Sequence, residues 1–181
     1  RLISFLSKCA SSGYAIPAAV LAIGIATTYS WIDHQIIYVW RRFFDVSPGL
    51  LLSGTVFALF AGYVVRFFAI GFNNIDSGFS SISKQFDEVG RSMGMKPSQT
   101  LIRVSWKRLR PMVFAAGVLL SVEIVKELPL TMILRPFNTE TLATQVFRLA
   151  SNEMMASAAI PALLIVALGT IAMILLRPHS S

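Results

Sequence analysis

The amino-acid sequence predicts an all-α membrane protein with about four transmembrane helices. Hydrophobic residues make up 55% of the 181 residues and charged residues only 14%, whereas about 25% of the residues of a soluble domain are charged. The apolar residues gather in runs of roughly the 20 residues that a helix needs to cross a bilayer. Since no run alternates as a barrel strand does, each is expected to be helical. The runs are 14–32, 49–72, 112–134 and 157–176.

The first two runs differ in their polar residues. Tyr38, Trp40, Phe43 and Phe44 follow the first run, and such aromatic residues are typical of a membrane–water interface. The second run contains Arg66, about two turns from its end, so the long side chain is expected to reach the lipid headgroups.

The segment 73–110 between the second and third runs is polar, basic and interrupted by glycine. Apolar residues at helical spacings predict a short amphipathic helix over 82–93. Gly94 can take the positive φ that ends a helix, and Pro97 suits the first turn of a second helix over 98–109. The first helix is either a docking surface for a soluble partner or a helix lying in the headgroups.

The third run contains the ionisable residues Glu123, Lys126 and Glu127. Spacings of three and four residues place them on one side of a helix, where Lys126 is expected to neutralise part of the charge of both carboxylates. A charge at mid-membrane costs about 2.5–3.5 kcal/mol, so this side is expected to face protein or water. Pro129 is expected to kink the helix. The cluster either lines or gates a hydrophilic pathway or clamps helices in register, whereas acid–base catalysis is disfavoured because no nucleophile or metal-ligand set accompanies it.

A short helix is predicted over 141–150, between the third and fourth runs. Asn138 or Thr139 is expected to cap it, with Glu140 in its first turn. This helix is either a lid or docking element at the mouth of a pathway or an interfacial helix that fills space.

The distribution of lysine and arginine predicts the orientation of the chain. If the segment 73–110 is cytoplasmic, ten basic residues lie on that side and four on the other, so both termini are cytoplasmic as well. The cytoplasmic set is Arg1, Lys8, Lys84, Arg91, Lys96, Arg103, Lys107, Arg108, Arg110 and Arg177, and the outer set is Arg41, Arg42, Arg135 and Arg148.

Other partners and chemistries find little support in the sequence. The net charge of +7 comes from residues beside apolar runs and lacks the aromatic interleaving that binds bases, so no nucleic-acid partner is expected. The lone Cys9 excludes an internal disulfide and a cysteine-based metal site. His34 and His179 are expected in loops, without partners for catalysis.

The motif Glu88-Val89-Gly90-x-x-x-Gly94 resembles the EAA loop of the permease subunits of ABC importers. That family has Glu-Ala-Ala, three residues, Gly, nine residues and Ile-x-Leu-Pro, so Val89 and Gly90 depart from it, as does Trp106-Lys107. Gly90 weakens a helix by about 1 kcal/mol relative to Ala, which implies a looser docking contact. The blocks Lys126-Glu127-Leu128-Pro129 and Leu134-Arg135-Pro136-Phe137-Asn138 resemble ferric-iron permeases in particular.

This resemblance implies a type I ABC importer permease core, in which residues 1–181 are one transmembrane domain and the carboxy-terminal half of a longer chain. It implies a bacterial inner-membrane location and, as partners, an ABC ATPase dimer, a periplasmic or extracellular solute-binding protein and a second permease half. Segment 73–110 would be the coupling loop. The residues implied to contact the ATPase are Phe86, Glu88, Val89, Gly90, Met93 and Gly94.

The implied function is import of a solute, ferric ion in particular, by alternating access. The ATP is used by the partner, since this sequence has no phosphate-binding loop, and the chain itself binds no cofactor. Glu123, Lys126 and Glu127 are the candidates for the pathway or gate, but not for a metal site, because Lys126 opposes a cation. The alternative is a membrane protein without transport function, such as an assembly scaffold or an intramembrane enzyme.

Overall fold

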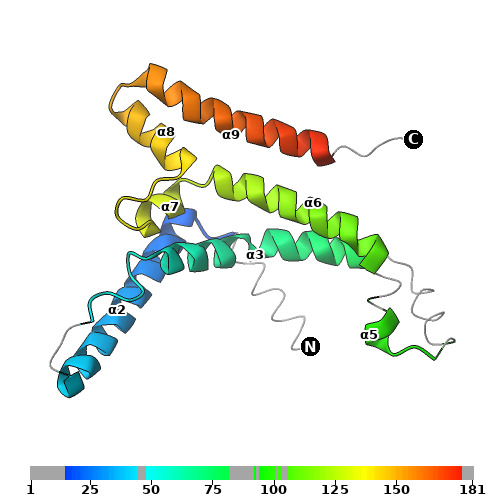
Figure 1. The fold of residues 1–181 in the computed structure, drawn as a ribbon, viewed down its shortest axis with the longest axis horizontal. Helices are drawn as coiled ribbons and strands as arrows, with labels where there is room; N and C mark the ends of the chain where they lie inside the picture. Colours follow the sequence, from blue (N-terminus) through cyan, green and yellow to red (C-terminus); the bar gives the residue numbers. More distant parts are fainter. Residues whose placement is uncertain are drawn as a thin grey trace.

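The computed structural model describes residues 15–44, 48–81, 92, 94–100, 102 and 106–176, and none of these lies in a strand. The all-α prediction is confirmed. The helices, shown in Figure 1, are α2 (Ala18–Phe44), α3 (Val56–Ser81), α5 (Pro97–Thr100), α6 (Trp106–Val125), α7 (Pro129–Leu134), α8 (Leu142–Ser151) and α9 (Met155–Leu176).

The helices α3, α6 and α9 form the body of the structure. α6 packs between α3 and α9, and α8 packs on α9. Figure 1 shows α5 at one end of this body and α7 and α8 at the other. α2 contacts α3 and α7 and then points away from the body, which leaves much of its length exposed.

Glycines on α3 allow its neighbours to approach closely. A Cβ added at Gly62 would lie 2.7 Å from Cδ1 of Leu134 and 3.0 Å from Cδ2 of Leu130, both on α7. At Gly78 it would lie 2.6 Å from Sδ of Met112, on α6. Heavy atoms do not approach a Cβ to such distances, so the ends of these leucine and methionine side chains occupy the space that a larger residue would fill.

Two of the described helices are long and apolar enough to cross a membrane, by length and composition: Val56–Gly78 within α3, and α9. They correspond to the second and fourth predicted runs. The third run, 112–134, is not one helix, because α6 ends at Val125 and α7 begins at Pro129.

α2 extends beyond the first predicted run and includes Asp33, whose side chain is buried in the fold. The Asp33 carboxylate is fully buried and accepts hydrogen bonds from the backbone N–H groups of Leu51 (3.1 Å), Leu52 (2.9 Å) and Ser53 (2.7 Å). The connection after α2 is thereby tied back to the middle of the helix. His34, predicted in a loop, also lies in α2, with Nδ1 2.7 Å from the carbonyl oxygen of Ser30.

The segment 73–110 differs from its predicted form at its start. α3 continues through its first residues as far as Ser81. Of the predicted helix 98–109, residues 98–100 lie in α5 and residues 106–109 lie in the first turn of α6, which begins at Trp106. Between them the structure describes Ile102, which is also helical. Pro111 lies inside α6, where it has no N–H group to donate to the carbonyl of Lys107 four residues earlier. The predicted helix 82–93 lies almost entirely outside the described residues.

Candidate functional site

The break between α6 and α7 brings buried charges together inside the fold. Pro129 has no N–H group and cannot continue the hydrogen-bonding ladder of α6. The last turn tightens instead, since the Glu127 N–H donates to the carbonyl of Ile124, three residues back, at 3.1 Å. Lys126 and Glu127 therefore lie beyond the end of α6, in the connection to α7.

Glu127 turns into the protein and makes two directed contacts. Its Oε2 lies 3.1 Å from Nε of Arg66, with only 8% of the glutamate side chain and 17% of the arginine side chain exposed. Its Oε1 accepts a hydrogen bond from the Leu130 N–H at 3.1 Å. The carboxylate thus satisfies a free donor in the first turn of α7 and explains why a helix restarts there.

Arg66 was expected to extend its side chain to the lipid headgroups, and this expectation was wrong. The side chain instead binds partners inside the protein. Besides Glu127, its Nη1 donates to the carbonyl oxygen of Ile16, just before α2, at 3.3 Å. Arg66 therefore joins α3, the start of α2 and the break before α7. Glu127, 61 residues away in the sequence, compensates the charge of Arg66. In an isolated membrane helix, this arginine would have to extend to the membrane surface to be solvated.

A second polar contact lies beside the ion pair. Thr131 is fully buried, and its hydroxyl donates to the carbonyl oxygen of Glu127 at 2.9 Å. The hydroxyl of Tyr63 lies 2.6 Å from Oγ1 of Thr131. Since the threonine proton is engaged with Glu127, Tyr63 is the donor in this pair. Tyr63 and Arg66 lie one turn apart on α3, so one face of that helix contacts both sides of the break.

The predicted cluster is divided into two ion pairs. Lys126 Nζ lies 2.6 Å from Oε1 of Glu123, and these side chains are 53% and 28% exposed. Lys126 was expected to neutralise both carboxylates, but Glu127 is paired with Arg66 instead. The helical spacing that predicted one cluster fails because α6 ends at Val125, between the two glutamates.

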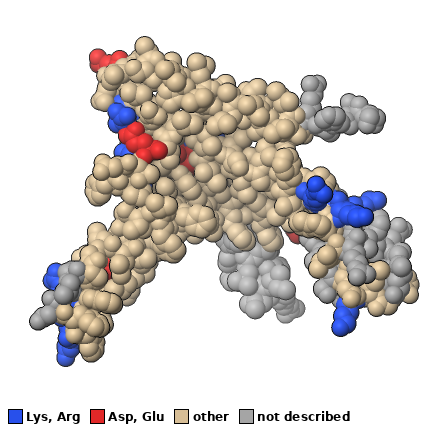
Figure 2. Space-filling model, in the orientation of Figure 1, with Lys and Arg blue, Asp and Glu red and all other residues tan. Residues whose placement is uncertain are grey.

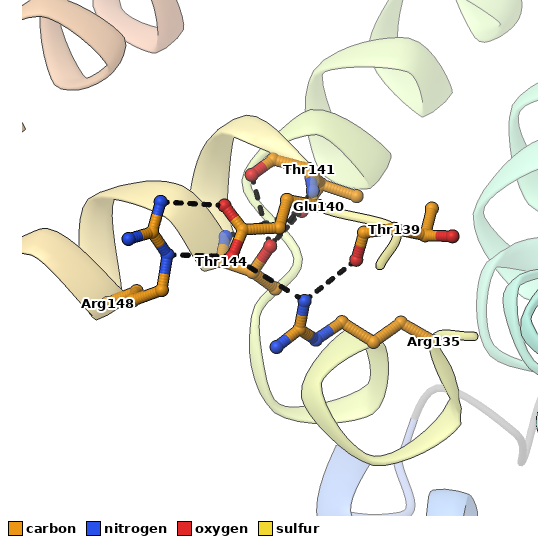
Figure 3. Close-up of polar contacts among 6 residues, drawn as sticks. All are labelled: Arg135, Thr139, Glu140, Thr141, Thr144 and Arg148. Carbon is orange, nitrogen blue, oxygen red and sulfur yellow. Dashed lines mark hydrogen bonds and ion pairs between the residues drawn. The ribbon is translucent and has the colours of Figure 1, made fainter. Parts of the chain in front are cut away.

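A third polar group lies at the same end of the body, between α7 and α8 (Figure 3). Glu140 accepts hydrogen bonds from Nε of Arg148 at 2.7 Å and from Nη2 at 3.1 Å. Its Oε1 lies 3.8 Å from Nη1 of Arg135, which donates to the carbonyl of Thr139 at 2.7 Å. The hydrogen bonds from Arg148 hold the pKa of Glu140 below its ordinary value, although desolvation acts in the opposite direction.

The cap of α8 differs from the predicted one. Thr141, rather than Asn138 or Thr139, is the N-cap, and its side chain and that of Thr144 exchange hydrogen bonds with each other's backbone N–H. Glu140 precedes the helix instead of lying in its first turn. Phe137, in the same connection, is 96% exposed.

A model of the family described as "Binding-protein-dependent transport system inner membrane component" matches residues 2–179. The chain belongs to this family. Its members are permeases of ABC importers, so the resemblance noted in the EAA-like motif is confirmed across nearly the whole chain.

Curated relatives of this permease have different stated solutes. The chain is 23% identical over 167 residues to the "Fe(3+)-transport system permease protein FbpB 2" of Haemophilus influenzae, covering 92% of this chain and 30% of the relative. It is 25% identical over 163 residues to the "Putative 2-aminoethylphosphonate transport system permease protein PhnV" of Salmonella typhimurium, covering 90% of this chain and 56% of the relative. The chain thus spans about a third to about half of the length of these relatives.

The permease residues predicted to contact an ATPase are described only at one position. Gly94 is exposed and has a φ of 69°, the left-handed conformation expected where a helix ends. Phe86, Glu88, Val89, Gly90 and Met93 lie outside the described residues. The described basic residues near this segment gather at the end of the body that carries α5 and the start of α6 (Figure 2), and they include Lys96, Lys107, Arg108 and Arg110.

Sequence reasoning missed the residues that complete these contacts. Tyr63 and Thr131 carry no signal of their own, because each depends on a partner on another element. A polar residue at the edge of an apolar run was the available indication for Asp33. Among the described residues, no group of three or more His, Cys, Asp or Glu side chains is arranged to hold a metal ion.

Proposed function

We propose that this chain is the membrane-spanning half of an ATP-driven importer that passes ferric ion from an external solute-binding protein to the cytoplasm. The observation that carries this proposal is the family match over residues 2–179. The named ferric-ion relative supports the choice of solute, as do the blocks around Glu127 and Phe137 in the sequence.

The proposed mechanism is alternating access. An ATPase dimer closes on ATP and displaces the helix around Glu88, and the helices of this chain and of a second permease half then open alternately to the two sides. ATP is bound and used by the ATPase only. The segment 73–110 and both ends of the chain are proposed to face the cytoplasm, which is consistent with the basic residues that gather beside α5 and α6 (Figure 2).

The two ion pairs at the helix break are proposed to have different roles. Glu123 and Lys126 keep part of their surface exposed, which suits side chains that line a hydrophilic pathway. Glu127 is almost fully enclosed by Arg66 and the start of α7, which suits a clamp. We therefore assign Glu123 to the pathway and Glu127 to the clamp.

An organophosphonate is the second candidate solute. The relatives named for 2-aminoethylphosphonate transport match this chain at a similar identity. The described residues also contain no metal-binding group of His, Cys, Asp and Glu, so nothing among them favours a metal ion over an organic anion as the cargo.

Uptake by the complete transporter decides between these solutes. Cells that lack this chain and its transporter partners should lose uptake of radioactive ferric ion under iron limitation and regain it with the intact genes. Loss of 2-aminoethylphosphonate uptake, with iron uptake unchanged, would overturn the ferric proposal and support the phosphonate one. If neither uptake depends on the chain, both solutes are wrong.

Copurification tests the proposed ATPase contact. Glu88→Ala and Gly94→Leu should each reduce the ATPase that copurifies with the chain several-fold, because the first removes a contact and the second strains a left-handed residue. Glu153→Gln, at the opposite end of the body, is the matched control and should leave the yield unchanged. Equal ATPase recovery from all of these variants would contradict the coupling role.

A further inference from the structure

The break between α6 and α7 separates two helices that pack against different neighbours. α7 packs mainly against α2 and α3, whereas α6 packs against α3 and α9. Residues 126–128 are not helical, and Pro129 offers no N–H group to link the two helices. A rotation at this break can therefore move α7 relative to α6 without unfolding either helix.

Side chains hold the break in its observed geometry. Arg66 Nε contacts Glu127 Oε2 at 3.1 Å on one side, and the Tyr63 hydroxyl contacts Thr131 Oγ1 at 2.6 Å on the other. Both donors come from one face of α3. Hydrogen bonds of this kind break and form as a whole, so the break can switch between two discrete arrangements. A packed core, in contrast, resists gradual deformation.

We propose that residues 126–128 form a hinge and that Arg66 is the positioning residue that latches it by holding Glu127. The Tyr63–Thr131 contact is the second half of the latch. This inference rests on the proposed transport function, and it assigns Arg66 no contact with the solute.

The burial of the pair determines how such a latch behaves. Opening the hinge separates Glu127 from Arg66 and leaves the carboxylate with little solvent, because only 8% of the glutamate side chain is exposed. An unpaired buried charge is unfavourable. The closed state is thus stable on its own, and opening requires the work that the ATPase supplies through the rest of the transporter.

A reversible cross-link between α3 and α7 tests whether the hinge moves. The pair Gly62→Cys and Leu134→Cys suits this purpose, because the added Cβ at residue 62 points at the Leu134 side chain that the second change shortens. Cys9→Ser removes the native thiol. The complete transporter, reconstituted in liposomes, should lose at least ten-fold of its solute transport when the pair is oxidised and regain it after reduction.

The outcomes separate the latch from the transport proposal. Equal transport in the oxidised and reduced states would overturn the hinge and leave the proposed function intact. If the reduced pair and the Cys9→Ser parent move neither solute, the proposed function fails, and the hinge is decided by the rate of disulfide formation. That rate should fall several-fold when a non-hydrolysable ATP analogue is bound, and an unchanged rate overturns the hinge.

A second variant tests the latch without cysteines. In Glu127→Gln the amide oxygen still accepts from the Leu130 N–H, so the start of α7 is kept while the ion pair is lost. The weakened latch should raise the ATP hydrolysed per solute transported several-fold. Asp33→Asn, which also neutralises a buried carboxylate, should lower the amount of folded protein without changing that ratio. If Glu127→Gln also leaves the ATP hydrolysed per solute transported unchanged, Arg66 and Glu127 have only a structural role and the latch is wrong.

Discussion

Glu123 and Glu127 are one helical turn apart in sequence but have different surroundings, because α6 ends between them. Glu123 stays on the helix and pairs with a neighbouring lysine, half of which is exposed. Glu127 turns toward α3 and pairs with Arg66 inside the protein. An exposed ion pair contributes about 0–1 kcal/mol, whereas removing one partner of a buried pair costs about 3–5 kcal/mol.

The difference predicts unequal effects on stability. Glu127→Gln removes the carboxylate that pairs with Arg66 inside the protein, so we expect it to lower the free energy of unfolding by about 3 kcal/mol. Glu123→Gln should lower it by less than about 1 kcal/mol. Equilibrium unfolding of the two purified variants in one detergent measures both values. Equal losses would show that Arg66 reaches solvent or another partner when Glu127 is neutralised.

The outer pair of Glu140 and Arg148 predicts a dependence on pH. The hydrogen bonds from Arg148 lower the pKa of Glu140 in the folded protein. The pair therefore stabilises the fold fully above the pKa of an unpaired glutamic acid, about 4.3, and this contribution is lost as the pH falls through the lower, folded value.

Melting temperatures across this range measure the effect. The difference in melting temperature between the parent and Glu140→Gln should be present at pH 6 and should shrink as the pH falls below about 4.3. Because the pair is exposed, the difference should be small and should shrink at high salt. Glu153→Gln serves as the control carboxylate, and a difference that grows on acidification would contradict the assignment.

At the scale of helices, periodicity and composition predicted some elements better than others. α9 lies close to its predicted bounds because it is apolar along its whole length and only lightly buried, so its sequence is set mainly by lipid. The third run was predicted as one helix, since a proline in an apolar run signals only a kink. The full break also requires the Glu127 carboxylate at the start of α7, and a side-chain contact across a break is invisible to helical spacing.

Contacts between helices were the least predictable part of the candidate site. Arg66 and Glu127 are 61 residues apart in the sequence and are joined by a hydrogen bond. Helical periodicity predicts only the helix face on which each residue lies, not the partner that it contacts. The three charged residues of the third run were found because ionisable groups are rare within membrane helices. Their actual partners depend on how closely α3 approaches α7, which glycine permits.

That approach makes a prediction for Gly62. Gly62→Ala places a Cβ 2.7 Å from Cδ1 of Leu134 and 3.0 Å from Cδ2 of Leu130, so we expect an overpacking cost of about 1–3 kcal/mol. The helix propensity of Ala offsets up to about 1 kcal/mol of this cost. Gly24→Ala and Gly117→Ala are matched controls, since both lie in helices with no atom within 4 Å of the added Cβ. These controls should be neutral or stabilising by up to about 1 kcal/mol. Unfolding of the three variants in detergent provides the comparison, and a tolerated Gly62→Ala would show that α7 can shift away from α3.

At the scale of the whole molecule, the two ends of the helical body differ in charge and in content. One end carries α5, the start of α6 and several lysines and arginines. The other carries the helix break, α7 and α8, where Glu140 offsets the charge of the nearby arginines. A chain inserted with its more basic end in the cytoplasm would direct the EAA-like segment toward an ATPase and Phe137 toward the outside.

Thiol labelling in whole cells tests this orientation. Lys96→Cys and Phe137→Cys, each in a Cys9→Ser background, introduce single thiols where the native side chains are exposed. Lys96 directly precedes α5 and Phe137 lies in the connection before α8, and these helices lie at opposite ends of the body (Figure 1). A membrane-impermeant maleimide should label the residue 137 variant in intact cells and the residue 96 variant only after the membrane is opened. Labelling of both in intact cells would contradict a membrane crossing between them. The reverse pattern would place the EAA-like segment outside, where no ATPase can reach it.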